Sequence, residues 1–329
     1  MKKVLIFLLE IVLIVLIGAI ALGIARQKVV RISGADTLDT SLKIADMLKE
    51  NLNVDKFKTI VVTRSDNYPD GLSGSYLAGK HNAPILLVSE ETIWEVRDYI
   101  EESIAYGGTV YLLGDSEVLS DSVVGGVEGV TVRRLGGDTR LETNLNILRE
   151  AGITEREIIV CSAWNFADSL SASVLNRPVL LVGEKLTDEQ KEFLAELPSG
   201  LKFYIIGGTS AVSNTVAEEL TMIGSVMRIS GENRCETSAN VARKFFAAPD
   251  SVVLIYSHDF AEGLCSIPLA MSINAPLILT NDQSSEYVTE FVADMKIRSG
   301  VVAAGKDRLS DELVVNVFGL ADPEKIKEG

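Results

Sequence analysis

The feature that most constrains this fold is a ten-residue motif that occurs three times along the chain. The copies are Arg31 to Thr40 (RISGADTLDT), Arg134 to Thr143 (RLGGDTRLET) and Arg228 to Thr237 (RISGENRCET). Each copy begins with arginine, has glycine three residues later, and ends in an acidic residue followed by threonine. The spacing of roughly 100 residues far exceeds the roughly 20–50 residues of solenoid repeats, so each repeat is long enough to bury its own core.

Each copy of this arginine motif follows a short apolar run and precedes a helical pattern, which predicts a strand, a tight turn and a helix. The candidate N-caps of the three helices are Asp36, Asp138 and Asn233. Such a junction directs free backbone N–H groups and the positive end of a helix outward, which suits an anion. The alternative interpretation is that the polar residues only tie the turn together, and the sequence leaves both open.

Two further motifs recur in step with the first. The second motif is TRSDNYPDGL at Thr63 to Leu72, CSAWNFADSL at Cys161 to Leu170 and YSHDFAEGL at Tyr256 to Leu264. The third motif is LLGDSEVLS at Leu112 to Ser120, IIGGTSAVS at Ile205 to Ser213 and the shorter AAGKDRLS at Ala303 to Ser310. Three motifs in the same order, three times, establish an internal repeat.

These motifs resemble the cell wall-binding repeat 2 family, and the resemblance covers about Val29 to Leu320. Proteins of this family carry three tandem repeats. The resemblance implies non-covalent attachment to a prokaryotic cell wall through an anionic wall polymer. It also implies three Rossmann-like α/β units in a pseudo-threefold arrangement, with a location in the cell envelope.

The hydrophobic pattern independently favours an α/β fold with parallel sheets. Strands alternate with helical patterns, and apolar strands such as Ile85 to Val88 are continuous, as expected when helices cover both faces. The small residues after Asp70 indicate a helix that packs closely on a neighbour. The expected segments are 1–28 (anchor or signal), 29–129, 130–224 and 225–320 (the three repeats), and 321–329 (a tail that frays).

The N-terminal segment is interpreted as a membrane anchor. Lys2 and Lys3 precede an apolar run from Val4 to Ala25, which as a helix would span roughly 33 Å of the lipid bilayer. This length favours a retained transmembrane helix over a cleaved signal peptide, although Ala19 and Ala21 leave a cleavage site possible. Glu10 would cost roughly 2–3 kcal/mol within the bilayer. The flanking charges leave the orientation open, and the family resemblance places the repeats outside.

Charge excludes one class of partner. The formal net charge is −15 and the sequence pI is about 4.7, which argues against nucleic acid. General attraction cannot hold an anionic polymer on such a chain, so binding must come from local arginines and backbone N–H groups.

Catalysis has little support in the sequence, and a cell-wall-binding protein that is not an enzyme is expected. His81 and His258 do not recur between repeats, and no cofactor or metal motif is present. The recurring acids are interpreted as helix caps: Asp70, Asp168 and Glu262. The three cysteines are interpreted as buried thiols: Cys161, Cys235 and Cys265. Two alternatives stay open, an α/β enzyme acting on an envelope sugar or nucleotide, and a scaffold that binds another envelope protein.

The predicted polymer site lies in equivalent grooves between the units of a monomer. Its residues are Arg31, Arg134, Arg140, Arg228, Arg234, Gly34, Gly137, Gly231, Asp36, Asp138, Asn233, Thr40, Thr143 and Thr237. The glycines would let the backbone approach the ligand closely. The first repeat has Thr37 in place of the second arginine, so its groove is expected to bind weakest. The competing interpretation pairs the arginines with Asp36, Asp138, Glu142 or Glu236 to hold the units together.

Overall fold

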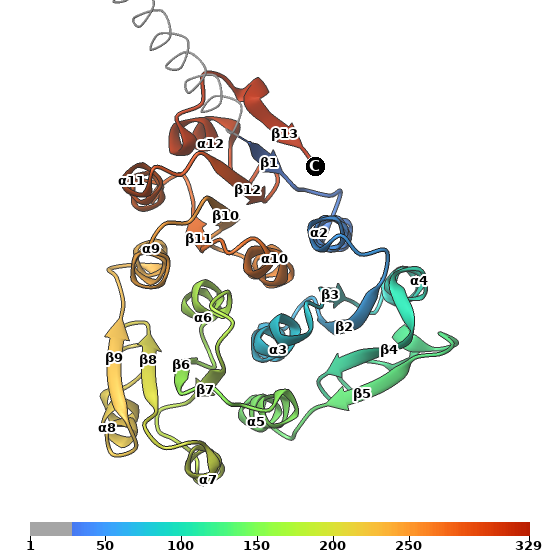
Figure 1. The fold of residues 1–329 in the computed structure, drawn as a ribbon, viewed down its shortest axis with the longest axis vertical. Coiled ribbons are helices and arrows are strands. Elements are labelled where there is room, and N and C mark those ends of the chain that lie inside the picture. The colour runs from blue at the N-terminus through green and yellow to red at the C-terminus, as the bar shows by residue number, and fades with distance from the viewer. Residues whose placement is uncertain (1–27) are drawn as a thin grey trace, which may run out of the picture.

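The computed structural model describes residues 28–329 and shows three α/β units grouped around a common centre (Figure 1). Each unit contains one sheet, and the recorded strand pairs in all three sheets are parallel. The strand orders are β3-β2-β4-β5, β7-β6-β8-β9 and β11-β10-β12-β1-β13 for the first, second and third units. Three α/β units with parallel sheets are therefore confirmed.

The strands follow the predicted apolar runs closely. In the first sheet they are β2 (Phe57–Arg64), β3 (Ile85–Val88), β4 (Ile104–Leu113) and β5 (Thr131–Leu135). In the second they are β6 (Glu157–Ser162), β7 (Val179–Val182), β8 (Lys202–Ile206) and β9 (Ser225–Ile229). In the third they are β1 (Val29–Arg31), β10 (Ser251–Tyr256), β11 (Leu277–Thr280), β12 (Ser299–Ala303) and β13 (Ile326–Glu328).

Helices separate these strands and cover the sheets. They are α2 (Thr37–Leu52), α3 (Tyr68–His81), α4 (Ile93–Ser103), α5 (Arg140–Ala151), α6 (Phe166–Ser173), α7 (Asp188–Glu196), α8 (Asn214–Thr221), α9 (Arg234–Phe245), α10 (Ala261–Ser272), α11 (Glu286–Met295) and α12 (Asp311–Phe318). Residues 28–329 also contain two short 3-10 helices, η1 (Asp121–Val124) and η2 (Pro323–Lys325).

The strand before each arginine motif belongs to the sheet of the preceding unit. β5 pairs with β4 and β9 pairs with β8, while β1 pairs with β12 at the far end of the chain. The helix after the motif packs on the next unit, as α5 does against β7. Each arginine motif therefore crosses from one unit to the next, and β1 closes the ring. The sequence repeats therefore begin at about 130 and 225, before β5 and β9. The structural units end after these strands, because β5 and β9 belong to the preceding sheets.

The C-terminal tail is more ordered than expected. β13 pairs in parallel with β1, and Ile326 is buried. The prediction that residues 321–329 fray is therefore wrong for this strand. The physical reason is that β1 would otherwise present an unpaired sheet edge, which β13 satisfies with backbone hydrogen bonds.

The helices that follow the second motif, α3, α6 and α10, meet at the centre of the molecule (Figure 1). Their starts carry Tyr68, Phe166 and Phe260, whose ring centroids are 5.5–5.8 Å apart in all three pairs. A Cβ at Gly71 would lie 3.0 Å from the Leu264 side chain. The close packing predicted for the small residues of α3 is thus confirmed, because a larger residue would push α10 away.

Two other predictions concern the cysteines and the membrane. Cys161, Cys235 and Cys265 are all buried and free, as expected. The proposed anchor, Val4 to Ala25, lies outside the described residues. Within residues 28–329, none of the helices has the length and apolar character that crossing a bilayer requires.

Candidate functional site: three inter-unit corners

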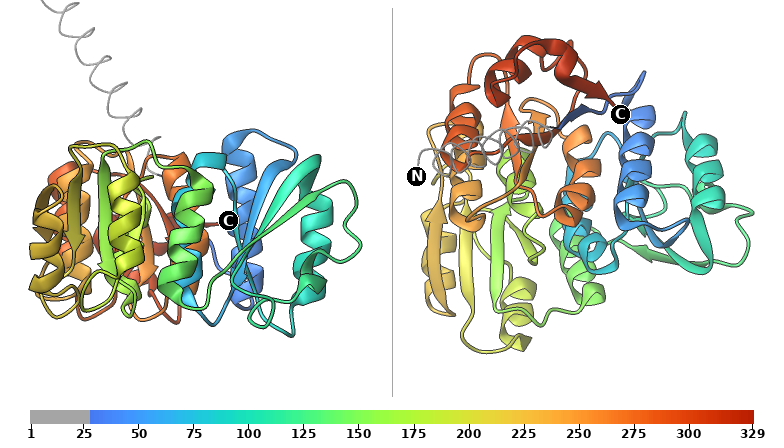
Figure 2. Two further views of the ribbon diagram at one scale, coloured as in Figure 1. Left: turned by 90° about the horizontal axis from the view of Figure 1, so that it is seen from below. Right: turned by 45° about the horizontal axis from the view of Figure 1, so that its top comes forward.

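All three motifs begin in the last residues of strands and continue into the loops that follow. In the first unit the second motif follows β2, the third follows β4, and an arginine motif follows β5. In the edge-on view of Figure 2, the helices stand side by side and run from one face of the molecule to the other. Because the strands are parallel and the central rings touch, the motif loops of all three units gather on one face. The carboxyl edge is where open α/β sheets commonly bind ligands.

The first arginine of each motif holds the loop that follows the neighbouring strand. Arg31 is 0% exposed and donates hydrogen bonds to Ala304 O at 2.7 Å and to Asp311 Oδ1 at 3.0 Å. Arg134 donates to the carbonyl oxygens of Gly114 and Leu119 at 2.9 and 2.8 Å. Arg228 makes the equivalent bond to Gly207 O and a second bond, one position further along the third motif, to Ser213 O. The prediction that Arg31 contacts a polymer is therefore wrong, because its side chain is fully enclosed.

The backbone N–H groups of the turn are already occupied by the motif itself. The Gly34 N–H donates to Thr40 Oγ1 at 2.8 Å, and the Ala35 N–H donates to Asp39 Oδ2 at 2.9 Å. In the third copy, the N–H groups of Gly231 and Glu232 donate to the side chains of Thr237 and Glu236. In these two copies, the acidic residue and the threonine that end the motif thus fill the anion position that the sequence assigned to a ligand.

In the second copy the acidic residue near the end of the motif also accepts a hydrogen bond from the turn. The Asp138 N–H donates to Glu142 Oε2 at 3.0 Å. The hydroxyl of Thr143 instead donates to Gly137 O, at 3.5 Å. The turn-tying interpretation accounts for these contacts in all three copies.

The motif glycines are required by the turn. A Cβ on Gly34 would lie 2.4 Å from the Thr40 backbone nitrogen, and one on Gly231 would lie 2.7 Å from the Thr237 nitrogen. At Gly137 the nearest atom would be Glu142 Cγ, at 2.7 Å. Real Cβ contacts are not this short, so glycine lets the helix start fold back onto the turn.

Two of the three expected N-caps are confirmed. The side chain of Asp36 accepts a hydrogen bond from the Asp39 N–H, and that of Asn233 accepts from the first turn of α9. Asp138 was expected to cap α5, but Thr139 does so by accepting from the Glu142 N–H at 3.2 Å. The second copy therefore begins its helix one residue later than the sequence pattern suggested.

The second arginines behave differently from the first. Arg140 donates to Ala163 O at 2.8 Å, and its guanidinium lies 5.4 Å from the centroid of the Trp164 ring. Arg234 donates to Ser257 O at 2.8 Å and lies 5.4 Å from the Phe166 ring. Both side chains are half-buried, and neither forms an ion pair with a carboxylate among residues 28–329. Each guanidinium has five N–H donors, so most of its donor capacity remains for a ligand.

The third corner, between the third and first units, is built differently. Its arginine motif has Thr37, and Arg308 of the third motif occupies the corner instead. Arg308 Nη1 lies 2.8 Å from Asp259 Oδ2 and 2.7 Å from Glu262 Oε1. The sequence comparison missed this residue because the third motif is one residue shorter here. Its only signal was a cation where the other copies have Val118 and Ala211.

The recurring acids lie in these corners rather than at helix caps. Asp70, Asp168 and Glu262 are each buried in the first turn of a central helix. In α6 the capping side chain is Asn165, which accepts from the Ala167 N–H. The prediction of a capping role is therefore wrong. A Cβ on Gly207, whose φ is 110°, would lie 2.5 Å from the Asp168 carboxylate, so the third motif wraps closely over this acid.

Burial sets the protonation of these acids. Desolvation raises the pKa of Asp70 to about 6, and the nearby Arg140 guanidinium opposes that rise. Burial also raises the pKa of Asp168 and of Glu262, opposed by Arg234 and Arg308 respectively. The first corner is therefore defined by Asp70 and Arg140, the second by Asp168 and Arg234, and the third by Glu262 and Arg308.

The raised pKa of Asp70 predicts a pH effect on stability. The folded state binds more protons than the unfolded state between about pH 4 and 6, so the contribution of Asp70 is fully present below its ordinary pKa. It is lost as the pH rises through about 6, by up to about 3 kcal/mol. We expect Asp70→Asn to be more stable than the parent at pH 7 and to show a flatter melting-temperature profile from pH 4 to 7. A parallel profile for the two proteins would contradict this.

The second corner opens into a groove of about 440 Å³ between the second and third units. It brings together residues that the sequence predicted for the site, and its lining includes Gly231, Asn233, Arg234 and Thr237. Asp168 and His258 also line it. The aligned second-motif positions thus lie beside the arginine motif of the following unit, which the linear sequence did not indicate.

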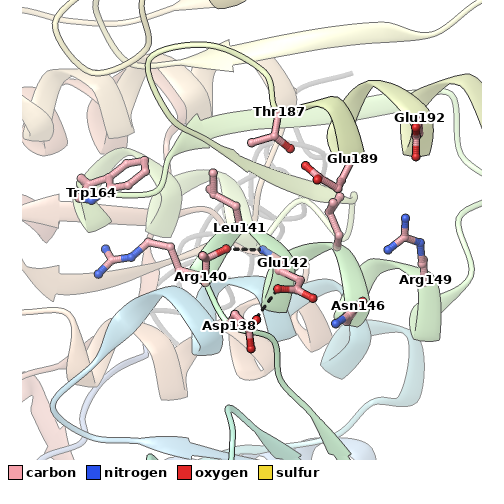
Figure 3. Close-up of a pocket in the computed structure, with 12 residues that line it drawn as sticks. Asp138, Arg140, Leu141, Glu142, Asn146, Arg149, Trp164, Thr187, Glu189 and Glu192 are labelled. Carbon is pink, nitrogen blue, oxygen red and sulfur yellow. Dashed lines mark hydrogen bonds between the residues drawn. The ribbon is translucent and has the colours of Figure 1, made fainter.

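Beside the first corner lies a larger pocket of about 850 Å³ between α5 and α7 (Figure 3). Trp164 and Arg140 lie at one end of this pocket, and Arg149 and Glu192 lie at the other. Of the predicted site residues, Asp138 and Arg140 line it. Arg140 is therefore placed where a ligand could reach it from solvent.

Comparison with known families gives a match over most of the chain. The model described as Cell wall binding domain 2 (CWB2) matches residues 31–124, 134–217 and 228–315. These three segments coincide with the three repeats read from the sequence.

Individual relatives agree with this match. The chain is 23% identical over 301 residues to N-acetylmuramoyl-L-alanine amidase LytC of Bacillus subtilis (strain 168), covering 89% of this chain and 58% of the relative. It is 24% identical over 311 residues to the amidase enhancer of the same organism, covering 89% and 41%. An uncharacterized protein of Pyrococcus horikoshii, PH0614, is 36% identical over 114 residues, covering 32% of this chain and 34% of that protein.

Among solved structures, Cwp8 from Clostridium difficile has a TM-score of 0.77 at 25% identity, covering 89% of this chain and 52% of that one. Cwp6 from the same organism also has a TM-score of 0.77, at 22% identity, covering 90% and 48%. The chain thus spans about half the length of these structures and shares their fold over that part.

Proposed function

Because the chain belongs to the Cell wall binding domain 2 family, we propose that it attaches non-covalently to a cell wall and that an anionic wall polymer is its ligand. The family match covers all three repeats, and similar proteins include N-acetylmuramoyl-L-alanine amidase LytC and the Cwp6 and Cwp8 proteins. The polymer itself and the residues that hold it are part of this proposal.

The observation that carries the proposal is the state of Arg140 and Arg234. They occupy equivalent corners on the same face of the molecule, and each uses one hydrogen bond to hold a strand-end carbonyl. A planar guanidinium with free donors can bind a phosphate or carboxylate in a bidentate manner. Two like corners on one face would also bind successive groups of one polymer, which raises the apparent affinity.

The third corner contributes least in this proposal. Arg308 is held by the carboxylates of Asp259 and Glu262, so its charge is already neutralised. Thr37 supplies no second cation. The sequence predicted that the groove formed by the first arginine motif, which has Thr37, binds weakest. The third corner is that groove.

Sedimentation with purified cell walls tests the proposal. The part that the structure describes, residues 28–329 without the proposed anchor, is expected to pellet with walls and not with membrane vesicles that carry integral envelope proteins. Pelleting with the vesicles alone would favour the alternative of a scaffold for another envelope protein. Removing wall phosphodiester polymers with hydrofluoric acid should abolish pelleting, and unchanged pelleting would contradict a phosphodiester polymer as the ligand.

We also propose that Val4 to Ala25 anchors the protein in the membrane. β1 runs parallel to β12, so the chain enters the third sheet at its amino edge, opposite the motif loops. An anchor before Lys28 would therefore leave the motif face directed away from the attachment point. This arrangement suits a protein held to a membrane at one side and to the wall at the other.

The anchor proposal makes a simple prediction about the mature protein. Mass spectrometry of protein isolated from its own cells is expected to show the N-terminal segment still attached, with the protein in the membrane fraction. A new N-terminus between about Ala21 and Arg26 would identify a cleaved signal peptide instead.

Catalysis is the less favoured function. One observation keeps it in view, because a carboxyl group with a pKa of about 6, as at Asp70, can act as a general acid. Burial also raises the pKa of Asp168 and of Glu262, and Glu262 is bound by Arg308. Three repeated buried acids match a structural role beneath the third motif better than a single active site.

A further inference from the structure

Trp164 is the most unusual residue on the motif face. It is 58% exposed, although its ring is large and apolar. The equivalent positions in the other two repeats are Asp66 and His258, so the repeat does not require an aromatic residue here. With more than half of its surface exposed, this side chain is not a core packing residue.

The ring is nevertheless held in a defined place. The Arg140 guanidinium lies 5.4 Å from its centroid, and a Cβ on Gly183 would lie 3.3 Å from ring atom Cζ3. The Trp164 backbone N–H donates to Ser162 Oγ at 3.2 Å. An exposed aromatic ring that is fixed in position loses little conformational entropy when a ligand packs on it.

The pocket beside the ring carries hydrogen-bonding groups rather than a uniform charge. Its lining includes the carboxylates of Glu142, Glu189 and Glu192, the guanidinium groups of Arg140 and Arg149, and the polar side chains of Asn146 and Thr187 (Figure 3). Donors and acceptors therefore surround an aromatic ring in a volume of about 850 Å³, within the range of small-molecule sites.

We propose that this pocket is a saccharide subsite, in which one sugar residue of the wall polymer packs its C–H face on Trp164. The hydrogens on a sugar ring carry partial positive charge and pair with the electron-rich face of an aromatic ring. The ring hydroxyls would bond the carboxylates and amide of the pocket. The carboxylates of the lining would repel a second phosphate, which leaves the anionic group of the polymer to Arg140 at the rim.

This inference rests on the proposed function, since it assigns the sugar of the same wall polymer. It adds that the first corner recognises carbohydrate, whereas the other two corners lack the ring. The protein would thus bind both the anionic group and the sugar of its ligand at the first corner.

The test uses the full-length protein in mild detergent, with soluble fragments released from purified cell walls by muramidase as the probe. Trp164→Ala is expected to weaken the Kd for these fragments about tenfold, the loss expected for one aromatic contact. Trp164→Phe should retain most of the affinity. Trp94→Ala is the matched control, because Trp94 is 64% exposed and lies on α4, outside the pocket.

Periodate treatment of the same fragments separates sugar from phosphate, because it opens sugar rings and leaves phosphodiesters intact. The parent is expected to bind treated fragments no better than Trp164→Ala binds untreated ones. Fluorescence of Trp164 in a Trp94→Phe background should change with untreated fragments only. An Arg140→Ala, Trp164→Ala double variant should bind the fragments more weakly than Arg140→Ala alone. If Trp164 acted only by positioning Arg140, the two variants would bind equally.

Equal binding by Trp164→Ala and the parent, or equal binding of treated and untreated fragments, would overturn the subsite while leaving wall attachment intact. Failure of the parent to bind the untreated fragments would overturn the subsite and the proposed function together.

Discussion

Replacing Arg31 by alanine is expected to lower the free energy of unfolding by about 3 kcal/mol, the low end of the range for breaking a buried charged pair, because Asp311 is 27% exposed and keeps Lys306 as a partner. Arg31 is fully buried and joins β1 to Ala304 O and to the Asp311 carboxylate. Its loss would leave a buried carbonyl without a partner and weaken the strand that closes the ring of units. We expect the melting temperature to fall by roughly 10 °C.

Arg134→Ala is the matched control for this effect. Arg134 makes the equivalent loop contacts, but its side chain is 23% exposed, so water can replace part of what is lost. A smaller loss of about 1–2 kcal/mol is expected there. Arg31→Lys should recover only part of the stability, because a single ammonium cannot reach both partners in the geometry of a planar guanidinium. An unchanged melting temperature in Arg31→Ala would show that β1 does not depend on this contact.

Replacing Arg140 and Arg234 together is expected to abolish wall sedimentation while changing the melting temperature little. A charge-assisted hydrogen bond contributes about 1.5–3 kcal/mol, so two such sites account for roughly 10²- to 10⁴-fold in affinity. At each site the folded state loses one carbonyl hydrogen bond, one ring contact and the attraction of the guanidinium for Asp70 or Asp168. The carboxyl group can bind a proton in place of that attraction, because burial already raises its pKa. Sedimentation with purified walls and thermal melting of the same preparations measure the two effects separately.

Three control variants sharpen this experiment. Arg140→Lys with Arg234→Lys keeps the charge beside Asp70 and Asp168 but removes bidentate geometry, so intermediate binding is expected. Arg243 lies in the last turn of α9, away from the motif face, so the Arg243→Ala variant should bind walls as the parent does. Arg308→Ala should lower stability, because it leaves buried Glu262 without its partner, with little effect on wall binding. A double alanine variant that melts well below the parent would instead identify structural arginines.

Much of the fold was accessible from the sequence because its signals are local. The continuous apolar run at Ile85–Val88 predicted a buried parallel strand, and it occurs as β3 with those bounds. The small residues of α3 predicted close helix packing, which the approach of Leu264 to Gly71 confirms. These features depend on side-chain size and periodicity within a few residues.

The roles of the motif residues were only partly accessible. The sequence grouped the arginines, glycines and threonines as one site because they recur together. In the structure, Gly34 and Thr40 satisfy the turn itself, while Arg31 is enclosed. Recurrence reflects any requirement shared by the repeats, and a turn that must fold back on its helix is as strong a requirement as a ligand.

The sequence by itself determined the triple repeat, the strand–turn–helix junctions, the parallel α/β class and the family, because each is written in residues close along the chain. The tertiary structure alone decided that β1 joins the last sheet, that β13 covers its edge, and that Arg308 takes the place left by Thr37. These contacts join residues as far apart as Arg31 and Ala304. No local pattern specifies such partners, since they are set by which edges and charges remain unpaired once the units have packed.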